Sequence, residues 1–358
     1  MPAKLAKLLP LALLLGAFSG CSGGAESISA TKNLPPVIVA ASGETQPVGT
    51  NNEDAADDPA IWRNAANPAA SLIVATDKKA GLYVYGIDGA KRSFIDAGLV
   101  NNVDLIDMGA QGIVVVASDR NDKKQAMLAV FRLDPATAAL TALGKVPAGK
   151  AEGYGICLAA GRFSGGGADA ITAFSVLKNG QIRQMLLTVR GDSVVKAKSR
   201  DLSVPTQPEG CVADEENGHL YIGEEDAGIW QFPLDSRGGT AGKIVARTDN
   251  QRLVADVEGL AIVDAAGGKR LLIASSQGDS AFAVFGLPDM QFKGRFAIGQ
   301  SGKWGAVSET DGIAVMAGSF GSAYPAGLFV AQDGDNGTRA QNFKLVSWQV
   351  VREAMKLD

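Results

Sequence analysis

The sequence predicts an all-β chain that folds as a six-bladed β-propeller, and three observations support this prediction. A unit made of a carboxylate, an apolar strand-like run, a turn and a second run ending in an aromatic residue recurs six times. Several strands per repeat at a long, regular period are typical of propellers. The 44 glycines suit a chain of tight turns, and 358 residues with 46% hydrophobic composition suffice for one large closed domain.

The six repeats follow one another along most of the chain, over residues 57–88, 101–134, 152–187, 209–235, 257–287 and 310–336. Their leading acids are Asp57, Asp104, Glu152, Glu209, Glu258 and Asp311, and subtracting consecutive positions gives spacings of 47, 48, 57, 49 and 53 residues. Because a propeller arranges the starts of its inner strands around one channel, we expect these six acids to face one small volume.

The first twenty residues are typical of a bacterial export signal rather than of a folded element. Lys4 and Lys7 precede an apolar run over residues 8–18, which is too short to span a bilayer. Small residues then precede Cys21, as in a lipobox. We expect residues 1–20 to be a lipoprotein signal peptide and Cys21 to carry lipid, so that the protein is anchored in the cell envelope, facing the periplasm or the outer surface. Secretion after ordinary cleavage is the alternative.

The rest of the chain divides into a tether and the propeller. Residues 21–50 are rich in polar and small residues and are expected to form a flexible tether, and residues 51–358 are expected to form the propeller domain. Part of this tether, residues 34–50, could instead supply a strand to the last blade and so close the ring without open edges.

Two further cysteines, Cys157 and Cys211, lie early in consecutive repeats. An exported protein folds in an oxidising compartment, so the two thiols could form a disulfide between neighbouring inner strands. Two separately buried thiols are the alternative.

The overall charge makes nucleic acid an improbable partner. The net charge is −4, the pI is about 5.3, and no basic stripe is present. We expect a monomer that binds no nucleic acid.

Several catalytic chemistries lack their residues here. His219 is the single histidine, and no arginine precedes it as in histidine phosphatases. Cys157 and Arg162 are one residue too close for a cysteine-phosphatase loop, and the chain has no GxSxG, HExxH or P-loop motif. Any catalysis must therefore depend on carboxylates, cations and metal-activated water.

The acids near the repeat starts point to hard cations, chiefly Ca²⁺, because their oxygen ligands come without histidine or cysteine. The candidates are Glu53, Asp54, Asp57, Asp58, Asn101, Asn102, Asp104, Glu209, Glu225, Asp256, Glu258 and Asp311. Crowded like charges are costly without a metal, so several calcium ions are expected.

Basic residues follow the second strand of the first three repeats. They are Lys78 and Lys79, then Arg120, then Lys178. We expect them on the same rim as the acids, where they could bind phosphate oxygens while metal ions bridge the others.

At these residues the sequence resembles the β-propeller phytases, the calcium-dependent alkaline phytases of bacteria. The resemblance covers nearly all of residues 50–350 and rests on long motifs in the same order: DDPAIW, TDKKAGLYVY, NNVDL, EGCVADEENGHLYIGEEDAGIWQF, ADVEGLAI, LIASSQGDSAFAVF, ETDGIAV and GLFVAQDGDN. It implies a six-bladed enzyme that releases phosphate from phytate, itself bound as a calcium complex, at a cleavage site beside an affinity site.

The resemblance also implies roles for individual residues. Those that would bind substrate phosphates are Lys78 or Lys79, Arg120, Tyr154 and Lys178. Those that would hold catalytic calcium and orient the attacking water are Asp54, Glu209, Glu225, Asp256 and Glu258. Those that would bind a structural calcium are Asp58, Asp311, Asp335 and Asn336.

The implied mechanism is direct attack by calcium-bridged water, without a covalent intermediate. One departure from the family is Ala314, where an acid usually follows DGI, and this puts one peripheral calcium or pocket contact in doubt. Two alternatives stay open. A propeller lactonase would need one metal and no phosphate-binding rim, and a non-catalytic lipoprotein would bind a partner on one face.

Overall fold

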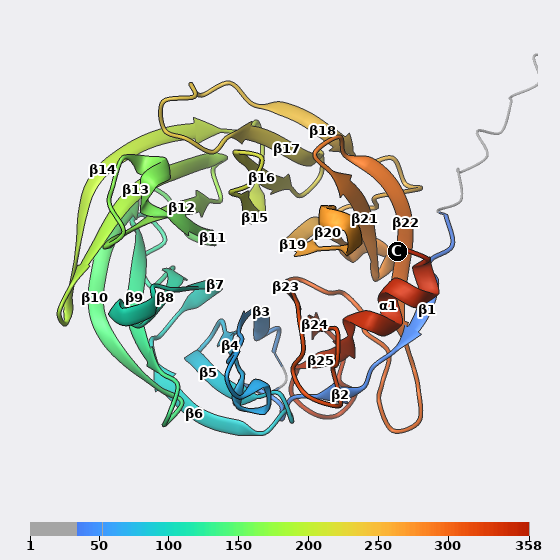
Figure 1. Ribbon diagram of the computed structural model, residues 1–358. Helices are drawn as coiled ribbons and strands as arrows, with labels where there is room; N and C mark the ends of the chain where they lie inside the picture. The colour runs from blue at the N-terminus through green and yellow to red at the C-terminus, as the bar shows by residue number, and fades with distance from the viewer. Residues whose placement is uncertain (1–33, 52, 358) are drawn as a thin grey trace, which may run out of the picture. The chain divides into compact units, whose positions relative to one another are not determined.

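The computed structural model describes residues 34–51 and 53–357, which fold into a ring of six small antiparallel sheets (Figure 1). Each sheet is one blade, and its first strand lies nearest the central channel. Blades 1 to 3 contain β3 (Ala56–Trp62), β4 (Leu72–Asp77), β5 (Gly81–Gly86) and β6 (Lys91–Asp96); β7 (Val100–Asp107), β8 (Ile113–Asp119), β9 (Ala126–Asp134) and β10 (Ala139–Gly149); and β11 (Gly153–Ala160), β12 (Ala170–Leu177), β13 (Gln181–Arg190) and β14 (Ser193–Ser203).

Blades 4 to 6 repeat the same order. They contain β15 (Pro208–Asp214), β16 (His219–Glu224), β17 (Gly228–Pro233) and β18 (Lys243–Arg247); β19 (Val257–Asp264), β20 (Arg270–Ser276), β21 (Ala281–Leu287) and β22 (Gln291–Gly299); and β23 (Ile313–Ala317), β24 (Gly327–Asp333) and β25 (Asn342–Ser347). Short 3₁₀ turns lie at Pro68–Ala70, Gly109–Gln111, Gly161–Ser164, Ala266–Gly268 and Gln277–Asp279. The predicted six-bladed propeller is therefore confirmed.

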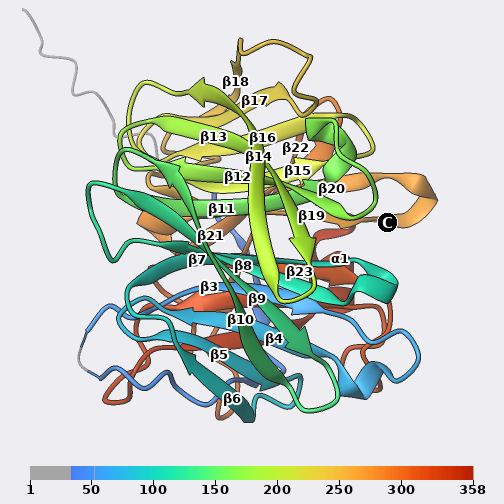
Figure 2. The same ribbon diagram turned by 90° about the vertical axis from the view of Figure 1, so that its left-hand side faces the viewer.

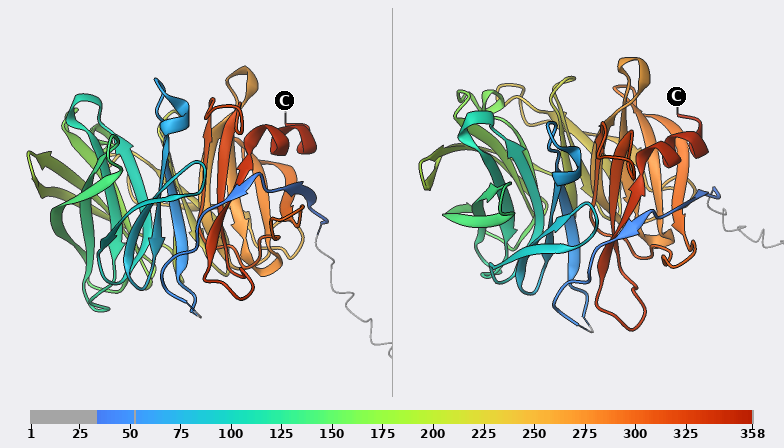
Figure 3. Two further views of the ribbon diagram at one scale, coloured as in Figure 1. Left: turned by 90° about the horizontal axis from the view of Figure 1, so that it is seen from below. Right: turned by 60° about the horizontal axis from the view of Figure 1, so that its bottom comes forward.

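The N-terminal segment completes the last two blades. Strand β2 (Gly43–Glu44) pairs antiparallel with β25 and becomes the outer strand of blade 6, and β1 (Val37–Ala40) pairs parallel with β22 as a fifth strand of blade 5. In Figure 3 these blue strands run along the outside of the orange and red ones. Both exposed edges are thereby covered; a strand from residues 34–50 in the last blade was expected, whereas the pairing of β1 with blade 5 was not. The tether expected over residues 21–50 must therefore end earlier, because residues 37–44 hold two paired strands.

The core consists of six separate hydrophobic clusters, one between each pair of neighbouring blades. The strands that face a neighbour on both sides are buried throughout, as in β4 and β24. Helix α1 (Trp348–Met355) follows the last strand and buries Trp348 and Val351 in the cluster between blades 5 and 6. Figure 2 shows the ring from the side, so that the blades are seen edge-on. Within the described residues, no helix is long and apolar enough to cross a membrane.

The lipobox, Cys21 and the export signal lie outside the described residues. The two later cysteines lie within them, and Cys157 and Cys211 form a disulfide between β11 and β15. Of the two alternatives for this pair, the structure shows the bonded one.

Candidate active site at the mouth of the channel

Each inner strand begins with the same irregularity, and it builds one ring of side chains. In β3, β7, β11, β15 and β19 the pairing with the second strand skips two residues directly after the first pair, which is a β-bulge. In blade 6, the bonds from Gln332 N to Gly312 O and from Gly312 N to Asp57 O put Asp311 at the same place. The first bulge residues, which we call the mouth ring, are Asp57, Asn101, Tyr154, Glu209, Glu258 and Asp311.

The second bulge residue is glycine in four blades because the next inner strand passes very close. A Cβ on Gly155 would collide with Glu209 O, and one on Gly210 would collide with Glu258 O. Gly259 and Gly312 are crowded in the same way. This close approach holds the mouth-ring residues of neighbouring blades side by side.

A second ring lies one position past the end of the second strand in each blade. The backbone N–H of each of its members bonds to the segment before its own inner strand, as in Lys78 N to Ala55 O and Glu225 N to Gln207 O. The equivalent residues in blades 1 to 5 are Lys78, Arg120, Lys178, Glu225 and Gln277. The structure therefore gives three of the four predicted cations, Lys78, Arg120 and Lys178, one shared structural position on blades 1 to 3.

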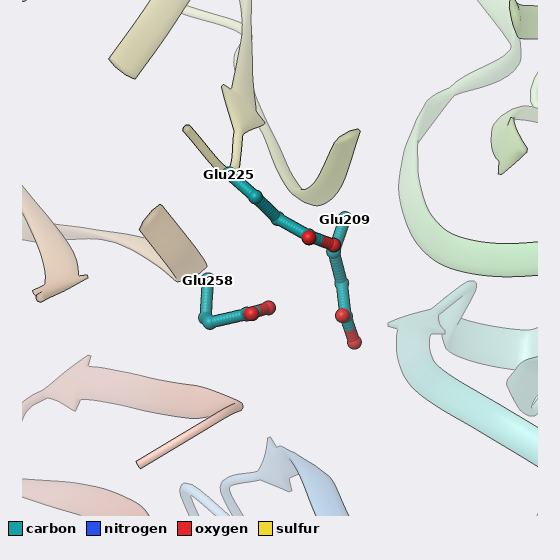
Figure 4. Close-up of side chains that lie close together, drawn as sticks. All are labelled: Glu209, Glu225 and Glu258. Atoms are coloured by element: carbon teal, nitrogen blue, oxygen red, sulfur yellow. The ribbon is translucent and has the colours of Figure 1, made fainter. Parts of the chain in front are cut away.

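Three glutamates from the two rings form a cluster without a cation among them. A carboxylate oxygen of each of Glu209, Glu225 and Glu258 lies within 4.8 Å of the others, and Figure 4 shows the three side chains converging from blades 4 and 5. Burial, with Asp57 nearby, raises the pKa of Glu209 well above its ordinary value. Burial, with Glu209 beside it, does the same to the pKa of Glu258. The cluster is thus a concentration of negative charge at low exposure.

Lys78 stands opposite, held by three acids. Its Nζ lies 2.8 Å from Asp54 Oδ2, 3.2 Å from Asp57 Oδ2 and 3.3 Å from Asp311 Oδ2. Burial would lower the pKa of Lys78, but Asp57, Asp311 and Asp54 outweigh it and raise the pKa above its ordinary value. Burial and Asp57, opposed by Lys78, raise the pKa of Asp311 to about 7. Lys78 therefore offsets the charge of this group of acids in the structure.

The cations of blades 2 and 3 surround Tyr154. Lys178 Nζ lies 4.2 Å from the centre of the Tyr154 ring, and the Arg120 guanidinium lies 5.7 Å from it. Arg120 also binds Glu152, with Nη2 2.7 Å from Oε1. Burial and then Glu209 raise the pKa of Tyr154, so its phenol stays protonated and can donate a hydrogen bond.

Asn101 joins the two halves of the site. Its amide accepts a hydrogen bond from Arg120 Nη1 and donates one to Glu209 Oε1 at 2.8 Å. Asn101 is fully buried. The sequence had marked it as a cation ligand, whereas its contacts make it a link between an arginine and a glutamate.

In blades 2 and 3 the residues at the ring position are Asn101 and Tyr154, not the predicted leading acids Asp104 and Glu152. Asp104 is not in the mouth ring: it lines the channel three residues past Asn101, and its oxygens accept from Leu105 N at 2.7 Å and Leu158 N at 2.8 Å. Glu152 likewise precedes Tyr154, the true ring member. The error arose because the ring positions in these blades carry Asn and Tyr, so the nearest acids were chosen instead.

Asp58 also faces the channel, a cavity of about 390 Å³ lined by all six inner strands. Its Oδ2 accepts from Val103 N in the next blade at 3.0 Å. Burial, with Asp57 nearby, raises the pKa of Asp58 well above its ordinary value, although the bond from Val103 N opposes this.

Asp335 and Asn336 lie elsewhere. They line a cavity of about 440 Å³ with Gly305, Ser308, Asp333 and Arg339. Asp335 Oδ1 accepts from Gly337 N, while Asn336 donates to Ala340 O and accepts from Arg339. The lining of this cavity does not include Asp58 or Asp311, the two other residues expected to bind a structural calcium.

The remaining predicted residues lie at the margin of the mouth. Lys79 is largely exposed and its Nζ is 3.7 Å from Glu53 Oε2. The backbone O of Asp256 accepts from Gln277 N, and burial with Asp226 nearby raises the pKa of its carboxyl. Gln277 itself was missed. It follows the second strand of its blade as Lys78 does, and its Nε2 donates to Asp311 Oδ1 at 2.5 Å.

The donor set fits a hard cation. The acids offer oxygen ligands only, and two buried oxygens, Asp57 Oδ1 and Glu258 Oε2, have no hydrogen-bond partner among the described residues. A cation between Glu209, Glu225 and Glu258 would satisfy Glu258 Oε2 and offset the repulsion that raises the pKa values of these acids. The cluster can therefore bind a metal ion.

Comparisons with known proteins identify the family of the chain. The phytase family model matches residues 5–358. A 3-phytase of Bacillus subtilis strain 168 is 37% identical over 331 residues, covering 88% of this chain and 85% of that protein.

Two solved structures resemble the fold. A structural-genomics protein of unknown function from Bacteroides thetaiotaomicron superposes with a TM-score of 0.51 at 10% identity, covering 88% of this chain and 75% of its own. The β-propeller domain of Cps50 (Swd1) from Myceliophteria thermophila gives a TM-score of 0.44 at 10% identity, covering 82% and 83%. From the family match and the related 3-phytase, this chain belongs to the phytase family.

Proposed function

We propose that this protein is a phosphomonoester hydrolase that releases inorganic phosphate from phytate and requires calcium for the reaction. One observation carries the proposal. The mouth holds a cluster of three glutamates directly beside a group of Arg120, Lys178 and Tyr154, and Asn101 connects the two. A polyanionic ester needs both parts: cations for its oxygens and carboxylates for metal ions.

The residues divide the work by their chemistry. Glu209, Glu225 and Glu258 would hold calcium, which when bound lowers the pKa of water and offsets the charge of the phosphate. Arg120 and Lys178 would bind phosphate oxygens. The protonated Tyr154 phenol would donate a further hydrogen bond to the same group.

Direct attack by water follows from the nucleophiles available. The cysteines within the described residues are joined in a disulfide, and His219 begins β16, away from the mouth ring at the other end of that blade. No covalent intermediate is therefore proposed. A lactonase would have no use for Arg120 and Lys178 beside the acids, which argues against that alternative.

The test is phosphate release from phytate by the full-length protein, with added Ca²⁺ and with EDTA. We expect phosphate release to require Ca²⁺. The melting temperature should fall by several degrees in EDTA, because an ion that binds only the folded state stabilises it. Full release and an unchanged melt in EDTA would refute the calcium requirement. No release under any calcium concentration would refute the proposed activity.

A substitution in the glutamate cluster sharpens the test. Glu209→Gln keeps the size and removes one charge from the cluster, so we expect kcat to fall at least tenfold even at saturating Ca²⁺, a loss of about 1.4 kcal/mol or more. Glu353→Gln on the exposed face of α1 is the matched control and should be unchanged. Normal turnover of Glu209→Gln would remove Glu209 from the proposed site.

A further inference from the structure

Neighbouring blades are joined near the mouth by a repeated kind of bond, and one junction differs. At five junctions a hydrogen bond ties one blade to the next: Val103 N to Asp58 Oδ2, Leu158 N to Asp104 Oδ2, Val257 N to Glu225 O, Ser275 Oγ to Thr310 O, and Gly312 N to Asp57 O. At the junction of blades 3 and 4, Ala160 N of β11 donates to Glu215 Oε1 of blade 4 at 2.7 Å at the end away from the mouth, but near the mouth no hydrogen bond among the described residues joins β11 or β12 to β15 or β16. The disulfide Cys157–Cys211 stands there instead.

The residue opposite the bulge bonds to the next blade in three of the six blades. Ser118 in blade 2 donates to Tyr154 O, Ser275 in blade 5 donates to Thr310 O, and Gln332 in blade 6 donates to Ala56 O. The equivalent residue is Thr76 in blade 1, which bonds within its own blade, and Val176 in blade 3 and Gly223 in blade 4, which have no polar side chain to donate. A Cβ on Gly155 would meet both Glu209 O and Val176 Cβ. The backbone oxygen of Glu209 therefore faces the Val176 side chain, which has no group that can donate to it.

The disulfide sits directly below two residues of the mouth ring. Cys157 is three residues after Tyr154 and Cys211 is two residues after Glu209, with a Cα–Cα distance of 5.6 Å across the junction. Both sulfurs are buried in the cluster between blades 3 and 4. This is the junction across which the cation half of the mouth meets the glutamate cluster.

We infer that the Cys157–Cys211 disulfide is a positioning element of the active site, which links the inner strands of blades 3 and 4 near the mouth and sets the distance between Tyr154 and Glu209. The inference rests on the proposed function, because it assigns these two residues to phosphate binding and metal binding. Without the crosslink, blades 3 and 4 can separate at the mouth while the rest of the ring remains closed.

The experiment compares full-length wild type with C157A/C211A, assayed well below both melting temperatures. We expect kcat/KM for phytate to fall at least tenfold and the Ca²⁺ concentration for half-maximal activity to rise. C157V/C211A, which fills part of the space left by the sulfurs, should show the same losses. Adding Val176→Ser to either pair restores a hydroxyl facing Glu209 O and should recover at least part of kcat/KM.

Two controls separate positioning from stability and from the proposed function. Leu143→Ala, buried between blades 2 and 3 away from the mouth, should lower the melting temperature without changing kcat/KM. If the cysteine variants also lose only melting temperature, the disulfide is a simple stabiliser and the inference is wrong. Calorimetric titration with Ca²⁺ gives a readout that does not need catalysis, so it applies even if wild type does not hydrolyse phytate. Weaker Ca²⁺ binding by C157A/C211A than by wild type would support the positioning role. Equal Ca²⁺ binding by the two proteins would overturn it.

Discussion

At the scale of single residues, similar acids at the mouth do different work. Glu224 and Glu225 are adjacent, yet Glu224 accepts from Thr206 N, Thr206 Oγ1 and Trp230 Nε1 and so fixes a loop, whereas Glu225 joins the cluster with Glu209 and Glu258. Asp77 fixes the loop at Thr50 in the same way. Whether an acid is a ligand depends on which donors already surround it, and backbone position decides that.

Asn101 gives the first prediction. Asn101→Ala removes the hydrogen bonds to Arg120 and Glu209, and bonds to charged groups contribute about 1.5–3 kcal/mol each. We expect kcat/KM for phytate to fall at least tenfold, with the fold intact by circular dichroism. Asn217→Ala, which loses a bond to Asp214 in a turn at the other end of β15, is the control. Equal activity of both variants would show that Asn101 does not position the site.

At the scale of elements, the inner strands are held to one another by side chains that point along the channel. Asp58 and Asp104 each accept a backbone N–H of the next blade. Burial raises the pKa of Asp104 to about 6, although the bonds from Leu158 N and Leu105 N oppose this. These acids therefore influence folding stability through their protonation, independently of any role at the mouth.

A pH prediction follows for Asp104. Because its pKa in the folded state lies above the ordinary value of 3.8, the folded protein binds the proton more tightly than the unfolded chain does. The stability that Asp104 contributes is present below about pH 4 and is lost as the pH rises through about 6. We measure the free energy of unfolding of wild type and of Asp104→Asn by urea titration in EDTA. The difference between the two proteins should fall by on the order of 1–3 kcal/mol as the pH rises through this window.

The control for this measurement is Asp289→Asn, in an exposed turn of blade 5. Its difference from wild type should not vary between pH 4 and pH 6. A flat difference for Asp104→Asn as well would mean that the carboxyl of Asp104 is not protonated in this range.

At the scale of the whole molecule, ring closure depends on joining the two ends of the described chain. Lys344 in β25 is buried between Glu44 Oε2 of β2 at 2.8 Å and Asp333 Oδ2 of β24 at 2.9 Å. Burial raises the pKa of Asp333 despite the opposing effect of Lys344. The last blade is thus assembled around one buried ammonium group, contacted from both ends of the sequence.

Lys344→Met should therefore destabilise the entire ring. Removing Lys344 leaves the buried Asp333 uncompensated, while Glu44 keeps Arg339, and breaking a buried pair typically costs about 3–5 kcal/mol. We expect a single unfolding transition shifted to lower denaturant concentration, measured by urea titration. Lys243→Met, at the exposed start of β18, should stay within about 0.5 kcal/mol of wild type. If the two variants unfold alike, the Lys344 network does not hold the closure.

The expected lipid anchor is also a whole-molecule property. If Cys21 carries lipid, wild type should partition into the detergent phase of a membrane extract, and Cys21→Ser should move to the aqueous phase. Phytate hydrolysis should be unchanged, since Cys21 precedes the first strand of the propeller. Aqueous partitioning of wild type, with an unmodified mature N-terminus at another residue, would support ordinary secretion instead.

The sequence by itself was sufficient for the number of blades, the family and the chemical character of the mouth. Repeat period and strand patterning are local properties, and Glu209, Glu258, Asp57 and Asp311 were placed correctly because an acid marks the ring in those blades. Tertiary structure alone decided which residues complete the ring, since Asn101 and Tyr154 share its position only through the bulge register.

Tertiary structure also decided what each charge faces. It turned Asp104 into a clamp between blades, enclosed Lys78 among three acids, kept Asp335 apart from Asp58, and bonded Cys157 to Cys211. The physical reason is that a strand register error of one residue reverses the direction of a side chain, and contacts between blades join residues about fifty positions apart. Periodicity along the chain does not say which residues contact one another across blades, because those contacts are set where the inner strands pack together.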